Sequence, residues 1–384
     1  MDFFTQPCPA VFTPIRAYAE VFARQASLPS LPQHTHQMLG AFAVYHFIFL
    51  VVSPILSRLI VPSRYNKFPR RTQVNWDVHV VSFVQSSFIC AFAIWVMFAD
   101  ADRKASGAAI GGEGALYRVF GYTGTGAAVQ AYAAGYFLWD LMICVYYFDI
   151  MGWGFVAHAI SALAVYTLGF VCLPTHTAHT LSLSLSLSLS LFRTLLTENN
   201  PKRPFVNYYA PIFILFEFSS PFLNIHWFCD KLNLTGSVYQ LVNGFFLLGS
   251  FFGCRILWGT YFSVQVFRDI FHVYAHPAPA SPEALIAAEA LSSEKMVAYP
   301  FAGLEVPLWL AAVYLSSNLV LNGLNYYWFS RMVVTVTARF NQPKKVKTDA
   351  DMDEKVWVEG SDVDVATPAE IAGEMARRRI KGKQ

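Results

Sequence analysis

Seven long apolar stretches, separated by shorter polar segments, dominate the pattern of the chain. An α-helix needs about 20 mostly apolar residues to cross the hydrocarbon layer of a membrane, and each stretch comes close to that length. The stretches cover residues 38–60, 80–98, 129–148, 153–173, 205–228, 238–262 and 306–329. The pattern therefore predicts an all-α fold, a polytopic transmembrane helical bundle of about seven spans.

The composition is typical of an integral membrane protein. Of the 384 residues, 55% are hydrophobic and only 14% are charged, whereas a soluble domain carries about 25% charged residues. The net charge of +3 is small and its basic residues lie beside apolar stretches, which argues against nucleic acid as a partner. Six cysteines without paired spacing indicate neither a disulfide framework nor a metal site. We expect membrane lipids as partners and neither a metal nor a cofactor; the sequence leaves homo-oligomerisation open.

Basic residues in the loops indicate the orientation. Arg58, Arg64, Lys67, Arg70 and Arg71 crowd the loop after the first span, and a second basic group follows the last. Such residues accumulate on the cytosolic side, so we expect the first loop and the C-terminus in the cytosol. The expected domains are an N-terminal segment (1–37), the first transmembrane helix with its basic loop (38–66), a transmembrane domain (67–332) and a disordered, charged tail (333–384).

One segment does not fit the helical pattern. Residues 181–191 read LSLSLSLSLSL, an alternation typical of a strand, and a lone strand in lipid leaves unpaired backbone groups. A repeated CT dinucleotide encodes the same alternation, and GTATGT, a form of 5′ splice site, can encode Val171-Cys172. We interpret residues 171–202 as a retained intron whose removal joins Phe170 to Arg203; a long loop is the alternative. Transcript sequencing across this junction distinguishes the two.

Polar side chains inside the apolar stretches are the candidate site residues, because an ionisable group within a membrane is costly and normally faces a partner or a cavity. Glu217, Ser220 and Asn224 share one helix face, and Pro211 and Pro221 are expected to kink that helix. This combination indicates a cavity. Seven residues are expected to bind a lipid: Trp139, Glu217, Ser220, Asn224, His226, Asn243 and Arg255. The equal alternative is structural, in which Glu217 or Asp140 pairs with Arg255 to lock the bundle.

His158 is the candidate catalytic residue. It lies among small residues that allow another helix to approach closely. A neutral imidazole can accept a proton from an incoming amine or hydroxyl, and Asp140 or Glu217 would orient the ring. An interhelical hydrogen bond is the structural alternative. His46 and His79 lie in weaker contexts and are assigned to no site.

Four blocks of the sequence together resemble the TLC-domain family, which includes the ceramide synthases. They are GYFLWDL (135–141), GFVAHAISAL (154–163), FVNYYAPIFILFEFSSPFLNIHWF (205–228) and NGFFLLGSFFGCRILWG (243–259). The resemblance covers roughly residues 67 to 332, apart from the Leu-Ser segment, and implies a TLC-domain-like bundle.

The chain departs from the ceramide synthases at their motif. Those enzymes carry two adjacent histidines and an acidic motif, thought to serve acyl transfer from acyl-CoA. Here His158 matches the first histidine, Ala159 stands at the second, and Glu217 lies where the acidic motif would be. The chain is more similar to the less characterised branch, for which the resemblance implies an integral membrane protein of lipid homeostasis in the endoplasmic reticulum.

Three functions are compatible with these features. The favoured one is a protein that binds or handles a lipid inside its helical bundle. The alternative is an acyl-CoA-dependent lipid acyltransferase, with His158 as the base and acyl-CoA as co-substrate. A small-solute transporter ranks third, because the sequence shows no convincing inverted repeat.

Overall fold

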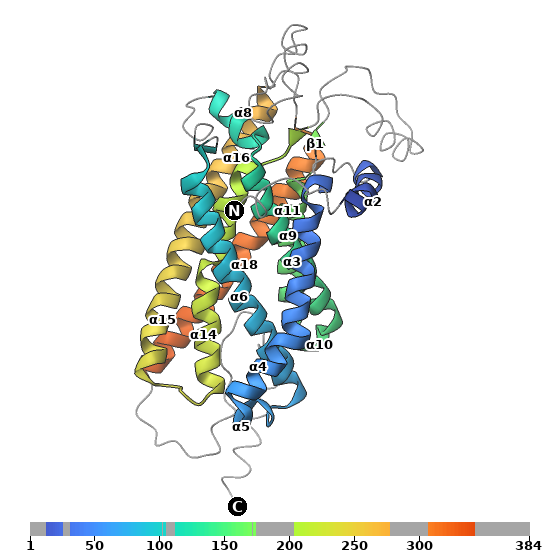
Figure 1. Ribbon diagram of the computed structural model, residues 1–384. Helices are drawn as coiled ribbons and strands as arrows, with labels where there is room; N and C mark the ends of the chain where they lie inside the picture. Colours follow the sequence, from blue (N-terminus) through green and yellow to red (C-terminus); the bar gives the residue numbers. More distant parts are fainter. Residues whose placement is uncertain are drawn as a thin grey trace, which may run out of the picture.

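A computed structural model describes residues 13–25, 31–101, 103–104, 112–170, 172–173, 203–276 and 306–341. Its long helices lie side by side in an elongated bundle, as Figure 1 shows. In the described part, the only sheet is a pair of two-residue strands, β1 (Cys172–Leu173) and β2 (Arg203–Pro204). The predicted all-α class is therefore confirmed. Of the predicted retained intron, residues 171 and 174–202 lie outside the described residues.

The helices follow one another along the chain. They are α2 (Thr13–Gln25), α3 (Leu31–Phe47), η2 (Ile48–Val52), α4 (Ser53–Ile60), α5 (Pro62–Tyr65), α6 (Arg70–Ala99), α8 (Gly112–Phe120), α9 (Gly124–Tyr146), α10 (Phe148–Met151), α11 (Trp153–Leu168), η3 (Asn207–Tyr209), α13 (Ala210–Phe213), η4 (Ile214–Ser219), α14 (Ser220–Lys231), α15 (Val238–Ser250), η5 (Phe251–Trp258), α16 (Gly259–Ala275) and α18 (Leu308–Asn341). The segments η2 and η5 are π-helices, and η3 and η4 are 3-10 helices.

Several helices are long and apolar enough to cross a membrane. In the described part, five continuous helical stretches meet that condition: Leu31–Ile60, Arg70–Ala99, Gly124–Tyr146, Asn207–Lys231 and Val238–Ala275. The other two predicted spans are helical as well: α11 is apolar but has 16 residues, and α18 has 34 residues including polar asparagines. The protein is thus a multi-pass membrane protein, while the count of seven spans stays a prediction.

The helix α6 begins earlier than the apolar pattern suggests. It starts at Arg70, ten residues before the predicted span at residue 80. Its first turns carry Asn75, Asp77 and His79, which are all buried. These polar residues interrupt the apolar pattern, so the predicted span begins after them. Inside a bundle their polar groups can find partners. This earlier start places three further polar side chains within the bundle.

The helix α9 packs between α3 and α11. Small residues make this close packing feasible, because they let helix backbones approach one another. A Cβ atom at Gly135 would overlap the backbone oxygen of Met38 on α3. Next to this contact, the ring of Trp139 is fully buried.

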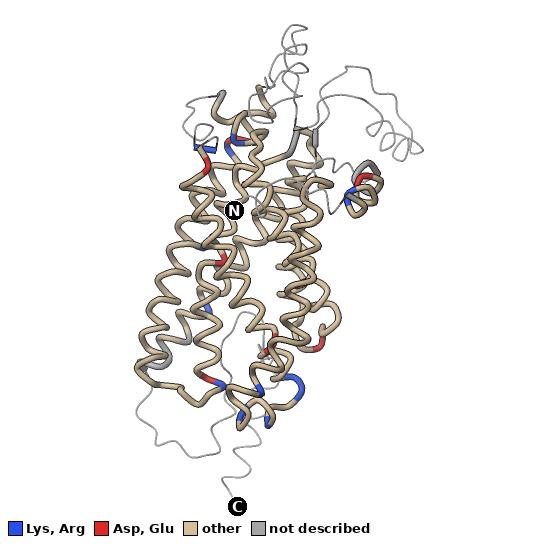
Figure 2. Tube along the Cα trace, viewed as in Figure 1, with Lys and Arg blue, Asp and Glu red and all other residues tan. Residues whose placement is uncertain are grey.

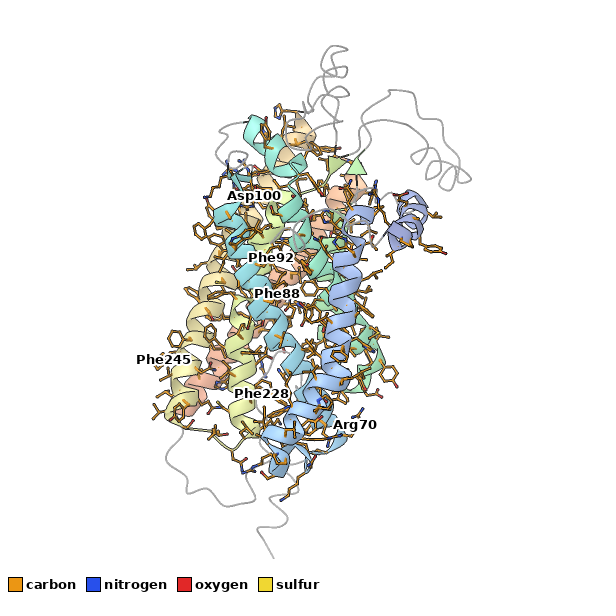
Figure 3. The ribbon with its side chains drawn as sticks, in the orientation of Figure 1. Arg70, Phe88, Phe92, Asp100, Phe228 and Phe245 are labelled. Carbon is orange, nitrogen blue, oxygen red and sulfur yellow. The ribbon has the colours of Figure 1, made fainter. Side chains whose placement is uncertain are left out.

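Charged residues gather at the two ends of the bundle, which Figure 2 shows in blue and red. In Figure 3, Arg70 and Asp100 mark the opposite ends of the bundle near the limits of α6. At one end, Arg118 donates from Nε and Nη2 to the two carboxylate oxygens of Asp269, at 2.5 and 2.8 Å. These hydrogen bonds raise the pKa of the Arg118 guanidinium above its ordinary value. Arg118 therefore stays charged and ties α8 to α16.

At the other end, a buried carboxylate joins the first two spans. Asp77 accepts hydrogen bonds from Ser53 Oγ at 2.6 Å and from the Tyr65 hydroxyl at 3.0 Å. Burial, followed by the nearby Asp77, raises the pKa of the Tyr65 hydroxyl above its ordinary value. Tyr65 therefore keeps its proton and acts as a donor, which fixes α5 against α6.

Candidate functional site

Polar side chains from several helices meet in one space, which we call the polar cavity. Its empty volume is about 620 Å³, which includes space open to the surroundings. Its polar wall consists of Asn75, His79 and Ser82 from α6, Tyr136, Asp140 and Cys144 from α9, His158 from α11, and Glu217, Ser220 and Asn224 from η4 and α14. The structure thus brings together residues that are up to 149 positions apart, from Asn75 to Asn224.

A second space adjoins the first, and we call it the aromatic cavity. Its empty volume, again with the space open to the surroundings, is about 430 Å³, and its wall includes Phe137, Tyr166, Phe213 and Phe216. His158 and Glu217 belong to the walls of both cavities. These two residues therefore lie where a polar compartment meets a largely apolar one.

The winding of the helix that carries Glu217 changes between the two prolines, while the expected kink stays a prediction. Pro211 stands in the first turn of α13 and Pro221 in the first turn of α14. Between them the chain winds as the 3-10 helix η4, Ile214–Ser219, which contains Glu217. Proline lacks a backbone donor and disfavours a helical residue before it, so the regular ladder is interrupted there. The predicted shared face is also confirmed, because Glu217, Ser220 and Asn224 all line the polar cavity.

Glu217 forms a buried ion pair. Its Oε1 lies 3.8 Å from Nη2 of Arg255, and its Oε2 accepts a hydrogen bond of 2.8 Å from Ser220 Oγ. Of the two predicted carboxylate partners for Arg255, the structure records this pairing for Glu217. Glu217 also lines both cavities, so the ion pair and a position on the cavity wall occur together, while its role in binding stays a prediction.

Arg255 is held from several sides. Its side chain is 1% exposed, and it donates to Ser219 Oγ at 3.0 Å, Ser220 Oγ at 2.9 Å and Asn325 Oδ1 at 3.1 Å. It stands in the π-helix η5, a geometry that often occurs at functional sites. A charge at this depth is tolerated only with such partners, so Arg255 links three helical segments at the cavity wall.

His158 and Asp140, the predicted catalytic pair, face the same cavity from neighbouring helices. The ring of His158 lies between Phe137, at a centroid distance of 6.0 Å, and Trp328, at 5.5 Å. Asp140 is approached by the thiol of Cys144 at 3.8 Å, one turn along α9. Their placement in one cavity is compatible with joint action, and the catalytic role stays a prediction.

Three predicted lipid-binding residues lie outside the walls of both cavities. Trp139 packs edge-on against Phe49, with ring centroids 5.8 Å apart. His226 faces α15, where its Nε2 is 3.4 Å from the amide nitrogen of Gln240. Asn243 donates to the backbone oxygen of Phe222 at 2.7 Å. These contacts join helices to one another, and the lipid-binding role of the three residues stays a prediction.

Sequence reasoning missed His79. Its Nδ1 lies 2.6 Å from Oδ1 of Asn224, and its ring stacks on Trp227 at a centroid distance of 4.2 Å. The residue lies one position before the predicted second span, in a context that the sequence analysis assigns to no site. The spacing of Asn75, His79 and Ser82 at i, i+4 and i+7 places them on one helix face and is the signal that could have revealed it.

Metal chemistry receives no support from these side chains. Within the described ranges, no group of three or more His, Cys, Asp or Glu side chains is arranged to hold a metal ion. The polar cavity is instead lined by hydrogen-bonding groups of mixed character, which suits an organic ligand.

The sequence matches a known family over most of its length. The family model described as TLC domain matches residues 75–188 and 176–334. The two matches overlap at residues 176–188, inside the segment that contains the Leu-Ser repeat. No protein of solved structure matches the chain significantly.

Curated relatives come from fungi and vertebrates. An uncharacterised TLC domain-containing protein of Schizosaccharomyces pombe is 29% identical over 367 residues, which cover 95% of this chain and 93% of the relative. Topoisomerase I damage affected protein 4 of Saccharomyces cerevisiae is 25% identical over 307 residues, or 78% of this chain and 83% of the relative. TLC domain-containing protein 4-B of Xenopus laevis is 24% identical over 220 residues, or 56% and 67%. With a family match that spans residues 75 to 334, this multi-pass membrane protein belongs to the TLC-domain family.

Proposed function

We propose that this protein binds a lipid inside its helical bundle and takes part in lipid homeostasis in the endoplasmic reticulum. The observation that carries the proposal is the junction of two unlike cavities at His158 and Glu217. A lipid has a polar head and an apolar chain, so its two parts match two such compartments. The head group would lie in the polar cavity and the adjoining part of the chain among the rings of the aromatic cavity.

The cost of burying polar groups supports a ligand at this place. Ionisable residues within a membrane normally face a partner or a water-filled path, because their desolvation is expensive. Asp140, His158 and Glu217 come from three different helical segments and still face one space. A bundle that needed only to hold together would not require them to converge. A ligand with hydrogen-bonding groups explains the convergence.

Co-purification tests the proposal directly. We expect the full-length protein, purified in a mild detergent, to retain a lipid that mass spectrometry identifies at a constant ratio to protein. Glu217→Gln and His158→Ala should each lower this ratio several-fold, because they alter the wall shared by both cavities. The control is Arg16→Ala on α2, whose side chain is exposed. Two outcomes would contradict lipid binding in these cavities. One is a wild-type protein that retains no lipid, and the other is an unchanged lipid-to-protein ratio in both variants.

The second candidate is an acyl-CoA-dependent lipid acyltransferase. It is favoured by one observation, the presence of His158 and Asp140 in the wall of a single cavity. His158 would take the proton from a lipid amine or hydroxyl as that group attacks the thioester, and coenzyme A would leave as the thiol. Acyl transfer from labelled oleoyl-CoA to membrane lipids measures this activity. Turnover that disappears in His158→Ala would establish the enzyme, and absence of turnover in the wild type would leave lipid binding alone.

A further inference from the structure

The hydrogen bond between His79 and Asn224 determines which nitrogen of the histidine carries the proton. Oδ1 of Asn224 faces Nδ1 of His79, and Nδ2 of Asn224 donates to Ser82 Oγ at 3.1 Å. An amide oxygen can only accept, and Nδ1 of His79 must therefore be the donor. A neutral imidazole protonated at Nδ1 has a lone pair on Nε2. His79 thus presents a hydrogen-bond acceptor on the opposite side of its ring.

This acceptor is held in place and available. The ring stacks on Trp227 at 4.2 Å and meets Phe228 edge-on at 6.2 Å, which prevents it from turning. His79 lines the polar cavity, and in the described part of the chain its Nε2 has no hydrogen-bond partner. Nε2 keeps accessible surface in the cavity, so a ligand there can donate a hydrogen bond to it.

A second polar group lies one helical turn away. Asn75 stands four residues before His79 on α6, is 3% exposed and lines the same cavity. Its Oδ1 is also without a hydrogen-bond partner among the described residues. Side chains four residues apart on a helix are neighbours, with Cβ atoms about 6 Å apart. Asn75 therefore places a second polar side chain beside His79 on the same cavity wall.

We propose that the polar cavity selects lipids whose head group donates a hydrogen bond from a hydroxyl or an amine, and that Nε2 of His79 is the acceptor. This inference rests on the proposed lipid binding and names the class of ligand. Anionic head groups do not fit, because the wall carries the acidic residues Asp140 and Glu217 and neither lysine nor arginine among its described lining residues. Head groups without a donor hydrogen leave Nε2 unsatisfied.

Paired probes that differ only in the donor test this selection. Purified full-length protein is offered dioleoylglycerol against its 3-O-methyl ether, and oleylamine against oleyltrimethylammonium, with binding measured by native mass spectrometry. We expect the donor member of at least one pair to bind at least tenfold more tightly than its methylated partner. The pair that shows the preference tells whether the donor is a hydroxyl or an amine.

Two substitutions assign the selection to His79. His79→Phe retains a ring on Trp227 but removes the lone pair, so the preference should fall to less than threefold. Asn224→Leu has a similar size and removes the oxygen that accepts from Nδ1, so the neutral ring can carry its proton on Nε2, which then donates instead of accepting. This variant should also lower the preference. The matched control, His272→Phe near the end of α16, should keep it.

The outcomes separate this inference from the proposed function. Equal binding of both members in each pair, binding of no probe, or an undiminished preference in His79→Phe would overturn the selection by His79. If endogenous lipid still co-purifies in those cases, lipid binding stands and only the ligand class is wrong. If the wild-type protein holds neither endogenous lipid nor any probe, the proposed function itself fails.

Discussion

Arg255 is a charged residue in an apolar helix, and its contacts connect several helical segments. The cost of burying its charge is offset by Glu217 and by three hydrogen-bond acceptors on other segments. The sequence marked Arg255 and Glu217 as unusual, because charges are rare in apolar stretches. It left open whether Glu217 or Asp140 would pair with the arginine, since that depends on how η5 and η4 are rotated against each other.

The ion pair leads to a prediction about stability. Arg255→Met leaves Glu217 buried without its cation, and breaking a buried pair in this way costs about 3–5 kcal/mol. We expect the substitution to lower the unfolding temperature strongly, as followed by fluorescence-detected size-exclusion chromatography after heating. The control is Glu20→Gln, which removes an exposed pair with Arg16 at 3.0 Å and should cost at most about 1 kcal/mol. Similar losses for both variants would show that the buried pair does not support the bundle.

At the scale of helices, small residues and prolines decide where the bundle is tight and where it opens. Gly135 allows α9 to touch α3, and the prolines around η4 interrupt the helix that lines both cavities. The change of winding could be predicted from the prolines alone, because their effect on the backbone is local. The partner of Gly135 could not, because a glycine in an apolar stretch does not say which helix approaches it.

A pair of glycine substitutions tests the helix contact. Gly135→Ala would place a Cβ atom against the backbone of Met38, and the resulting shift of α3 should cost about 1–3 kcal/mol. Gly40→Ala is the matched control, since a Cβ there meets nothing within 4 Å. In a helix, alanine is favoured over glycine by about 1 kcal/mol, so Gly40→Ala should be neutral or stabilising. Thermal unfolding of both variants measures the difference, and equal stability would contradict the close contact.

At the scale of the whole molecule, the course of the chain agrees with the expected orientation. The first basic loop and the end of α18 lie at the same end of the bundle, opposite α8 (Figure 1). The basic residues of α4 and α5 therefore share a membrane face with the start of the predicted tail. Which face of the membrane this is stays a prediction from the basic loop residues.

Cysteine labelling tests the orientation in sealed vesicles. Ser63→Cys in α5 and Lys104→Cys beyond α6 place thiols at exposed positions near opposite ends of the bundle. An impermeant maleimide added to microsomes should label Ser63→Cys at once and Lys104→Cys only after the membrane is permeabilised. The unsubstituted protein gives the background from the native cysteines. The reverse order of labelling would place the first loop in the lumen.

The strand pair also bears on the Leu-Ser segment. β1 and β2 pair Leu173 with Arg203, so the chain leaves and rejoins the bundle at neighbouring points. Replacing residues 174–202 by Asn-Gly would close this pair with a two-residue hairpin turn. We expect the shortened protein to express, to stay monodisperse and to unfold at the same temperature or higher, because the closure cost of a loop changes slowly with length. Aggregation of the shortened protein would show that the segment is needed for folding.

The sequence by itself determined that this protein lies in a membrane, that it is helical and that the regular winding is disturbed near η4, because hydropathy and proline act locally along the chain. It also placed Glu217, Ser220 and Asn224 on one helix face, because the spacing of residues in the sequence determines which of them share a face. Only the tertiary structure placed His79 beside Asn224, joined Glu217 to Arg255 and made His158 part of two cavities. Those contacts depend on the packing and rotation of helices far apart in sequence, which no local pattern encodes.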